Sequence, residues 1–158
     1  MPGKKRKIFG TIVFYYICSL IICFLDQASK ACVKMLVAEG VSIPVVGRVV
    51  HITLVHNRGS AFGMFKGCSY LFAGITFGVV ILISYFLAAK NKALNVYEKI
   101  SLCFILGGAC GNLIDRIRYG YVVDFIDFRV WPVFNLADSF ITSGAVILIF
   151  SMFFKKER

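Results

Sequence analysis

Two aspartates, Asp124 and Asp138, have sequence surroundings that suit carboxylate chemistry. Asp124 lies between Val123 and Phe125, Asp138 lies within an apolar run, and neither has a basic residue beside it. Two carboxylates brought together in apolar surroundings cannot easily both ionise, so they share a proton. One can then act as a general base on water while the other, protonated, polarises a carbonyl group. Such a pair would hydrolyse a peptide bond without a metal ion or a covalent intermediate.

A second group of polar residues interrupts other apolar runs. Asp26 and Lys30 are one helical turn apart and can pair, and Asn112 shares a helix face with Asp115 and Arg116. A charge in hydrocarbon costs about 3 kcal/mol on insertion scales, so charges gathered there pair with each other, line a water-filled pocket, or do both. We therefore predict an ion-pair network that ties helices together for Asp26, Lys30 and Asp115, in preference to a chemical role.

The apolar runs must supply the helices that hold these residues. The chain has 158 residues, of which 59% are hydrophobic, and its mean hydropathy is +0.81. Soluble domains are about half apolar, so this excess predicts one membrane domain, residues 1–158. Four runs are long enough to cross a hydrocarbon core of about 30 Å, and they cover residues 8–25, 67–89, 100–117 and 133–154. We therefore expect an α-helical membrane protein with four transmembrane helices.

Residues 30–66, between the first two spans, predict a small β-sheet on the membrane surface. Val45 to Val55 is rich in β-branched residues, and glycine and proline punctuate the segment, as is typical of short strands joined by turns. The shorter segment 118–132 has five aromatic residues, which favours an aromatic belt at the membrane interface.

The distribution of charge predicts the orientation. Ten Lys and Arg residues lie on the side of the two termini and the 90–99 loop, against eight on the other side, which favours cytoplasmic termini. At about 1.5 Å of rise per helical residue, Asp26, Asn112 and Asp138 reach a similar depth. Polar residues from three helices therefore converge on one layer near the outer boundary of the membrane.

Several other classes of function fit the sequence less well. The net charge is +10, but the basic residues lie mainly at the ends of apolar runs, which argues against nucleic-acid binding. No H-E-x-x-H motif supports a metallopeptidase, and the cysteines lack metal-ligand or disulfide spacing. A serine peptidase based on Ser60 would need a nearby histidine, yet no span contains one. A small proton-coupled exporter remains the alternative from another class, although it would want a carboxylate nearer the midplane.

Five blocks in order carry a resemblance to a known family. They are Asp26-Gln27-Ala28-Ser29-Lys30, Asn57-Arg58-Gly59-Ser60-Ala61-Phe62-Gly63, Gly107-Gly108-Ala109-Cys110-Gly111-Asn112-Leu113-Ile114-Asp115-Arg116, Val122-Val123-Asp124-Phe125 and Phe134-Asn135-Leu136-Ala137-Asp138-Ser139. Together with the four spans, they make the chain resemble the bacterial lipoprotein signal peptidases, or signal peptidase II. One departure is Ser60, where the family more often has alanine.

The resemblance implies a role for each block. Asp124 and Asp138 match the catalytic aspartates, and the other matched residues fall into two groups. Residues that line the substrate pocket are matched by Asn57, Asn112 and Arg116, and residues that support the site are matched by Asp26, Lys30, Asp115 and Asn135. The implied enzyme is a membrane aspartyl endopeptidase of the bacterial cytoplasmic (inner) membrane that needs no cofactor or metal. It would cut prolipoproteins just before a cysteine that carries a diacylglyceryl group, in contact with membrane lipid, and globomycin would inhibit it.

Overall fold

The computed structural model describes residues 2–59 and 69–155. Its elements, in order, are α1 (Pro2–Leu36), β1 (Ser42–Val46), β2 (Val50–Asn57), α2 (Ser69–Ala89), α3 (Val96–Tyr119), β3 (Val122–Asp127) and α4 (Leu136–Lys155). In these described ranges, four helices are long and apolar enough to cross a membrane, so the protein is a multi-pass membrane protein. Ser60 and the first two residues of the predicted second span, 67 and 68, lie outside the described residues.

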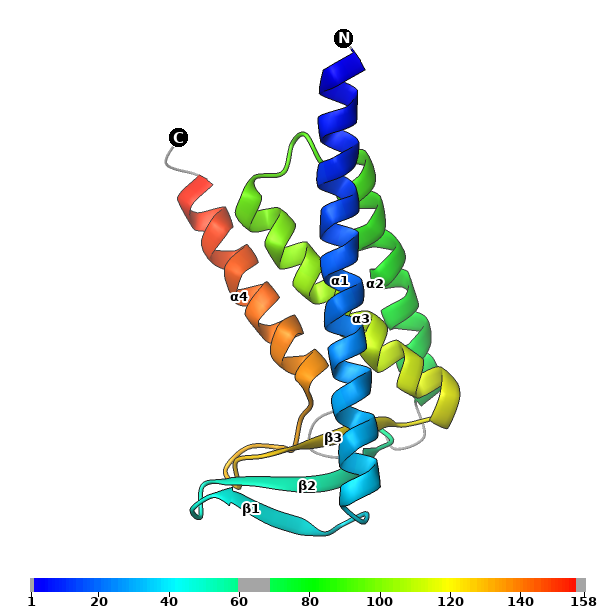
Figure 1. Ribbon diagram of the computed structural model, residues 1–158, viewed down its shortest axis with the longest axis vertical. Helices are drawn as coiled ribbons and strands as arrows, with labels where there is room; N and C mark the ends of the chain where they lie inside the picture. Colours follow the sequence, from blue (N-terminus) through cyan, green and yellow to red (C-terminus); the bar gives the residue numbers. More distant parts are fainter. Residues whose placement is uncertain (1, 60–68, 156–158) are drawn as a thin grey trace.

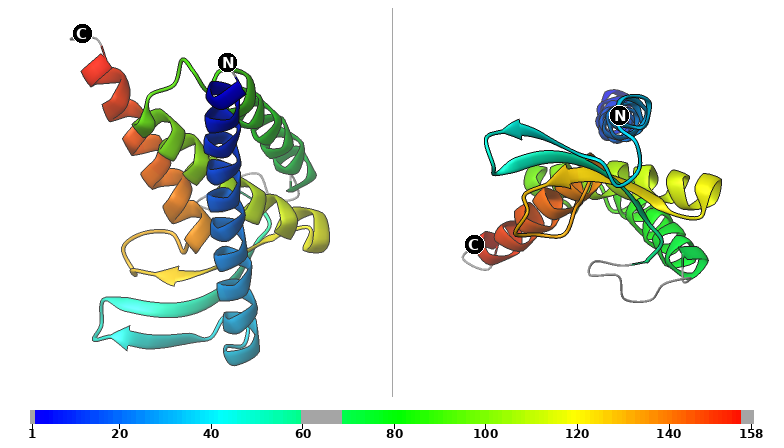
Figure 2. Two further views of the ribbon diagram at one scale, coloured as in Figure 1. Left: turned by 45° about the horizontal axis from the view of Figure 1, so that its top comes forward. Right: turned by 90° about the horizontal axis from the view of Figure 1, so that it is seen from below.

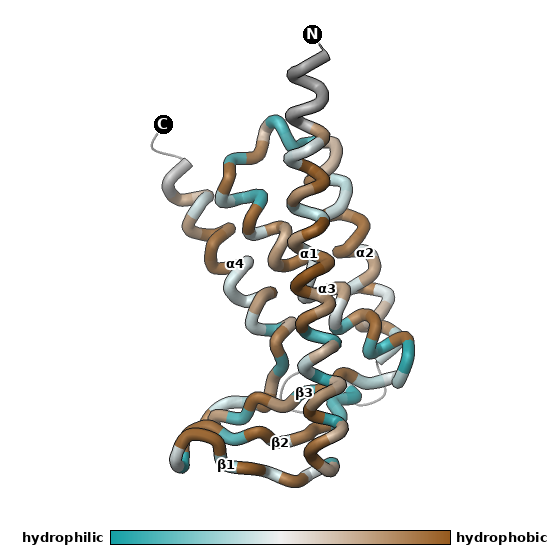
Figure 3. Tube along the Cα trace, viewed as in Figure 1, coloured by the Kyte–Doolittle hydropathy of each residue, from teal (hydrophilic) through white to brown (hydrophobic). Residues whose placement is uncertain are grey.

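The helices form a bundle with the sheet across one end (Figure 1). Both termini lie at the opposite end of the bundle, as the left view in Figure 2 also shows. Helix α3 is the central element, because it packs against α1, α2 and α4. Figure 3 shows that the middle of the bundle is largely hydrophobic, while hydrophilic residues gather in the α2–α3 loop and where the helices meet the sheet.

Glycines on α3 allow this close packing. A Cβ atom at Gly107 would lie 2.7 Å from the backbone oxygen of Ser19 on α1, and one at Gly108 would lie 2.5 Å from the backbone oxygen of Ala137 on α4. A Cβ at Gly111 would collide with the carboxylate of Asp26. Small residues at these positions therefore bring α1 and α4 close enough for their polar side chains to meet those of α3.

The helix ends differ from the predicted spans for local reasons. Helix α1 continues to Leu36, beyond the predicted end at residue 25, because the charges of Asp26 and Lys30 pair within the helix. Helix α3 begins earlier than predicted, at a capping box in which Asn95 and Glu98 bond each other's backbone N–H groups. It ends at Tyr119 and is capped by Gly120, whose φ of 73° is left-handed.

The sheet joins the two segments that the sequence analysis treated separately. Its order is β1-β2-β3 and both pairings are antiparallel. Strands β1 and β2 confirm the sheet predicted in the first segment. Strand β3 comes from the second segment, where the aromatic residues had indicated only an interfacial belt. The register pairs Val55 with Asp124 and Asn57 with Val122, which brings the end of β2 beside Asp124.

Candidate active site

Asp124 lies on β3 and is almost completely buried, with 2% of its surface exposed. Both of its carboxylate oxygens accept hydrogen bonds. Asn57 Nδ2 donates to one at 2.8 Å, and Asn135 Nδ2 donates to the other at 2.7 Å. The strand pairing explains the first contact, because Asn57 ends β2 next to β3.

Asp138 lies in the first turn of α4 and is half-buried. Its backbone N–H donates to Asn135 Oδ1 at 2.9 Å, and its own carboxylate accepts from the backbone N–H of Asn135 at 3.3 Å. This reciprocal pattern is a helix cap. The other carboxylate oxygen accepts from Asn112 Nδ2 at 2.8 Å. Since Asn135 also bonds Asp124, the same residue holds both carboxylates in place.

The surroundings of Asp124 favour its protonated form. Burial raises the pKa of Asp124, and the negative charge of Asp138 raises it further, so that it reaches about 7. Hydrogen bonds from Asn57 and Asn135 act in the opposite direction, because they stabilise the carboxylate. Burial and the like charge outweigh these bonds, so Asp124 can hold a proton near neutral pH.

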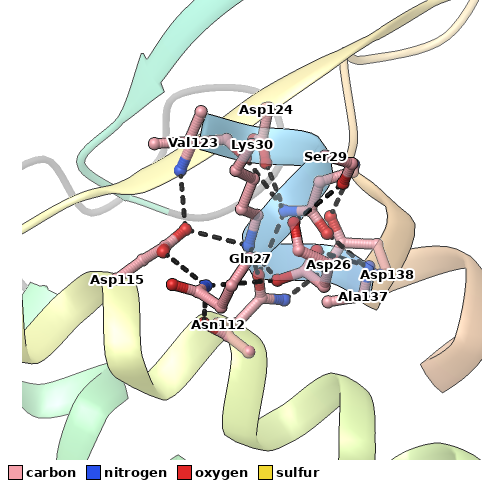
Figure 4. A network of polar contacts seen from close by, with 12 residues as sticks. Asp26, Gln27, Ser29, Lys30, Asn112, Asp115, Val123, Asp124, Ala137 and Asp138 are labelled. Carbon is pink, nitrogen blue, oxygen red and sulfur yellow. Dashed lines mark hydrogen bonds and ion pairs between the residues drawn. The ribbon is translucent and has the colours of Figure 1, made fainter. Parts of the chain in front are cut away.

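An ion-pair network lies beside the two aspartates (Figure 4). Lys30 Nζ on α1 is 2.7 Å from Asp26 Oδ2 and 2.8 Å from Asp115 Oδ2 on α3. All three residues are buried, and the pairing confirms the network predicted for them. Lys30 also donates to Asn112 Oδ1 at 3.0 Å. One buried cation therefore bridges two carboxylates and orients the amide that bonds Asp138.

The same network anchors the strand and the helix that carry the two aspartates. Asp115 Oδ2 accepts from the backbone N–H of Val123 at 3.1 Å, directly before Asp124. Asp26 Oδ1 accepts from the backbone N–H of Ala137 at 2.9 Å, directly before Asp138. Two of the supporting residues matched by the resemblance, Asp115 and Asp26, thus each bond the backbone directly before one member of the pair.

Gln27 is a member of this site that the sequence analysis did not single out. Its Nε2 donates to Asp115 Oδ1 at 2.9 Å and to the backbone oxygen of Gly111 at 3.1 Å. The signal was present, because an amide beside Asp26 inside an apolar helix needs a partner on a neighbouring helix. The backbone N–H of Ala137, which donates to Asp26, could not be predicted in this way, because every residue except proline has such a group.

Arg116 and Asp127 lie at the edge of the site. Arg116 is half-buried, its Nη1 approaches the backbone oxygen of Asn112 at 3.5 Å, and it has no ion pair with a described acidic residue. Asp127 accepts from Thr53 at 2.7 Å and from the backbone N–H of Arg129 at 2.7 Å. Burial alone would raise the pKa of Asp127, but these bonds and the Arg129 charge lower it. Asp127 is thus a structural carboxylate beside Arg129.

The fold and the site together define a multi-pass membrane protein with two neighbouring carboxylates at the sheet end of its bundle. The family model for signal peptidase (SPase) II matches residues 18–154. The lipoprotein signal peptidase of Halothermothrix orenii is 50% identical over 137 residues, which are 85% of this chain and 91% of that protein. That of Clostridioides difficile is 35% identical over 148 residues, which are 92% of this chain and 99% of that protein.

A solved bacterial membrane enzyme structure has a similar fold, with a TM-score of 0.82 and 30% identity over 93% of this chain and 90% of that one. The chain belongs to the signal peptidase II family. It is therefore an aspartic peptidase that removes the signal peptide from prolipoproteins. The alternative of a proton-coupled exporter has no support from these comparisons.

Proposed function

We propose that Asp124 and Asp138 are the catalytic pair of this single-domain peptidase. The observation that carries the proposal is their shared contact with Asn135, whose amide bonds Asp124 and whose backbone N–H bonds Asp138. The pKa of Asp124, raised to about 7, suits the partner that keeps the proton. Asp138, half-buried and bonded by Asn112, suits the partner that activates water.

In this mechanism Asp138 takes a proton from a water molecule while the water oxygen attacks the scissile carbonyl carbon. Asp124 donates its proton to the carbonyl oxygen, and a tetrahedral intermediate forms without a bond to the enzyme. When the C–N bond breaks, Asp138 returns a proton to the leaving amine, and Asp124 takes back a proton from the hydroxyl group whose oxygen becomes the new carbonyl oxygen. Asn57, Asn112 and Asn135 hold both carboxylates in position throughout, since each of the three amides donates to one of them.

The proposed substrate is a prolipoprotein whose cysteine carries a diacylglyceryl group, with cleavage just before that cysteine. Such a cysteine holds the scissile bond near the membrane surface, where the pair lies at the sheet end of the transmembrane helices. Arg116 is the proposed substrate contact, because its half-buried guanidinium forms no ion pair with a described acidic residue and can donate to carbonyl oxygens. Globomycin is the proposed inhibitor.

The proposed location is the bacterial cytoplasmic membrane, with both termini in the cytoplasm and the sheet on the outer side. The two termini lie at one end of the bundle (Figure 1), and the lysine and arginine counts favour that end as the inner one. A reporter that is active only in the periplasm should be silent when fused at Arg158 and active at Gly47. The reverse pattern would place the catalytic pair in the cytoplasm and refute this orientation.

Cleavage of a purified diacylglyceryl-modified prolipoprotein tests the proposed function. The wild-type enzyme should cut it just before the modified cysteine, globomycin should block the reaction, and the unmodified precursor should remain uncut. Asp124→Asn and Asp138→Asn should each abolish cleavage in a folded protein, and the double variant should be no worse, because members of one catalytic unit are not additive. Asp127→Asn is the matched control and should keep substantial activity. Full activity in Asp138→Asn would refute the mechanism.

A further inference from the structure

Two cations converge on one aromatic ring away from the proposed catalytic pair. Lys34, in the last turn of α1, places its Nζ 3.9 Å from the centroid of the Tyr119 ring at the end of α3. Arg118 places its Cζ 5.4 Å from the same centroid. Both cationic residues are exposed. Neither takes part in the hydrogen bonds or ion pairs that hold the catalytic pair.

No described acidic residue balances these two charges. The ion pairs of the described chain involve Lys30, His56 and Arg129, and the nearest acid in sequence to Lys34, Glu39, contacts His56 at 2.9 Å. Partial negative charges at the two helix ends favour a cation at each, but they are smaller than a full charge. Two positive groups at one ring therefore create a position where an anion is favoured.

The position corresponds to the lipid headgroup layer. Lys34 is eight residues beyond Asp26 on α1, or about 12 Å, and Arg118 is three residues beyond Asp115 on α3, or about 5 Å. The headgroup layer extends about 5–8 Å beyond the hydrocarbon on each side, and a long lysine side chain can bridge the remaining distance.

The neighbouring apolar side chains indicate a lipid rather than a free anion. Met35, Leu36 and Ile117 are 84%, 79% and 66% exposed. Met35 and Leu36 lie at the end of α1 and Ile117 lies near the end of α3, so exposed apolar side chains are present at the same two helix ends as the cations. A phospholipid can satisfy both, because its phosphate meets the cations and its acyl chains meet the apolar side chains.

We propose that Lys34, Tyr119 and Arg118 form a binding site for the phosphate of an anionic phospholipid in the leaflet on the sheet side. Stacking fixes the position of the Tyr119 ring. The centroids of Tyr119 and Tyr121 are 5.6 Å apart, and those of Tyr121 and His56 are 4.2 Å apart. The ring thereby orients Lys34 before any lipid arrives, which lowers the entropic cost of binding. The bound lipid is distinct from the substrate, whose scissile bond must reach Asp124 and Asp138.

Lipid retention by the purified full-length protein tests the proposal. Native mass spectrometry in detergent, with phosphatidylglycerol or phosphatidylcholine added, measures the affinity for each lipid. The wild type should bind phosphatidylglycerol at least about tenfold more tightly than phosphatidylcholine. Lys34→Gln/Arg118→Gln should lose most of that preference, since each cation near anionic lipid contributes roughly a fivefold effect. Arg48→Gln/Lys92→Gln removes two other exposed charges and should keep the preference.

Each opposite result overturns the proposal. An equal loss in the control double variant would show that net charge alone attracts the lipid. A wild type without preference for phosphatidylglycerol would show that no such site exists. Glycerol phosphate at the same concentration should not displace the lipid, and displacement would identify a site for a soluble anion instead. The single variant Tyr119→Leu keeps both charges and should weaken binding by about threefold, while thermal unfolding confirms that each variant is folded.

Discussion

Replacing Asp124 with asparagine should alter the pH dependence of stability as well as remove activity. The pKa of Asp124 is raised from 3.8 to about 7 in the folded protein. The folded state therefore binds the Asp124 proton more tightly than the unfolded state does. That preference stabilises the fold fully below the unfolded pKa, and it is lost as pH rises through the folded pKa. Above pH 7, burying the ionised Asp124 costs the fold about 4 kcal/mol relative to low pH.

Asp124→Asn removes this titration, so the variant should gain on the wild type as pH rises. Between pH 4.5 and pH 8.5 the difference in unfolding free energy should change by about 3 kcal/mol in favour of the variant. For a chain of this length, that change corresponds to about 6–12 °C in the gap between the two melting temperatures. Thermal unfolding of both proteins in the same detergent, at several pH values in this range, measures the gap.

Asp127→Asn is the internal control for this experiment. The pKa of Asp127 is lowered in the folded protein, so its carboxylate stabilises the fold above the unfolded pKa and loses that effect only as pH falls through the lower, folded value. The variant should therefore be less stable than wild type by an amount that stays constant from pH 4.5 to pH 8.5. If the gap for Asp124→Asn were equally constant, the raised pKa of Asp124 and its role as proton holder would both be refuted.

Three further variants test the packing and the network around the pair. Gly111→Ala places a methyl group against the Asp26 carboxylate and should lower the unfolding free energy by about 1–3 kcal/mol. The control Gly74→Ala has no atom within 4 Å of its new Cβ and should not lower it. Equal melting temperatures for the two variants would contradict this packing. Lys30→Met leaves two buried carboxylates without their cation and should cost about 3–5 kcal/mol in thermal unfolding. Arg116→Lys keeps the charge but loses the planar guanidinium, so the cleavage rate should fall at least about tenfold while the melting temperature stays unchanged. Full activity of this variant would argue against directed hydrogen bonds from Arg116 to the substrate.

Local patterns in the sequence were sufficient for the spans and for one ion pair. An apolar run of transmembrane length is a property of contiguous residues, so it can be read from the sequence. In the described part of the chain, each of the four predicted spans lies on a helix, apart from a few residues at the span ends. The pairing of Asp26 with Lys30 follows from helix geometry alone, because residues four apart lie on the same face. Two carboxylates with apolar neighbours were likewise visible in the sequence as candidates for shared-proton chemistry.

Tertiary structure alone decided which groups meet. The sequence could not show that Lys30 reaches Asp115 on another helix, or that residues 122–127 join β2 as a third strand. That strand also gives Asp124 and Asp127 different surroundings. Residues three apart on a strand point to opposite faces, so Asp124 faces Asn57 and Asn135 while Asp127 faces Thr53. Such contacts depend on the packing of segments far apart in the chain, and a pattern of neighbouring residues carries no information on their register.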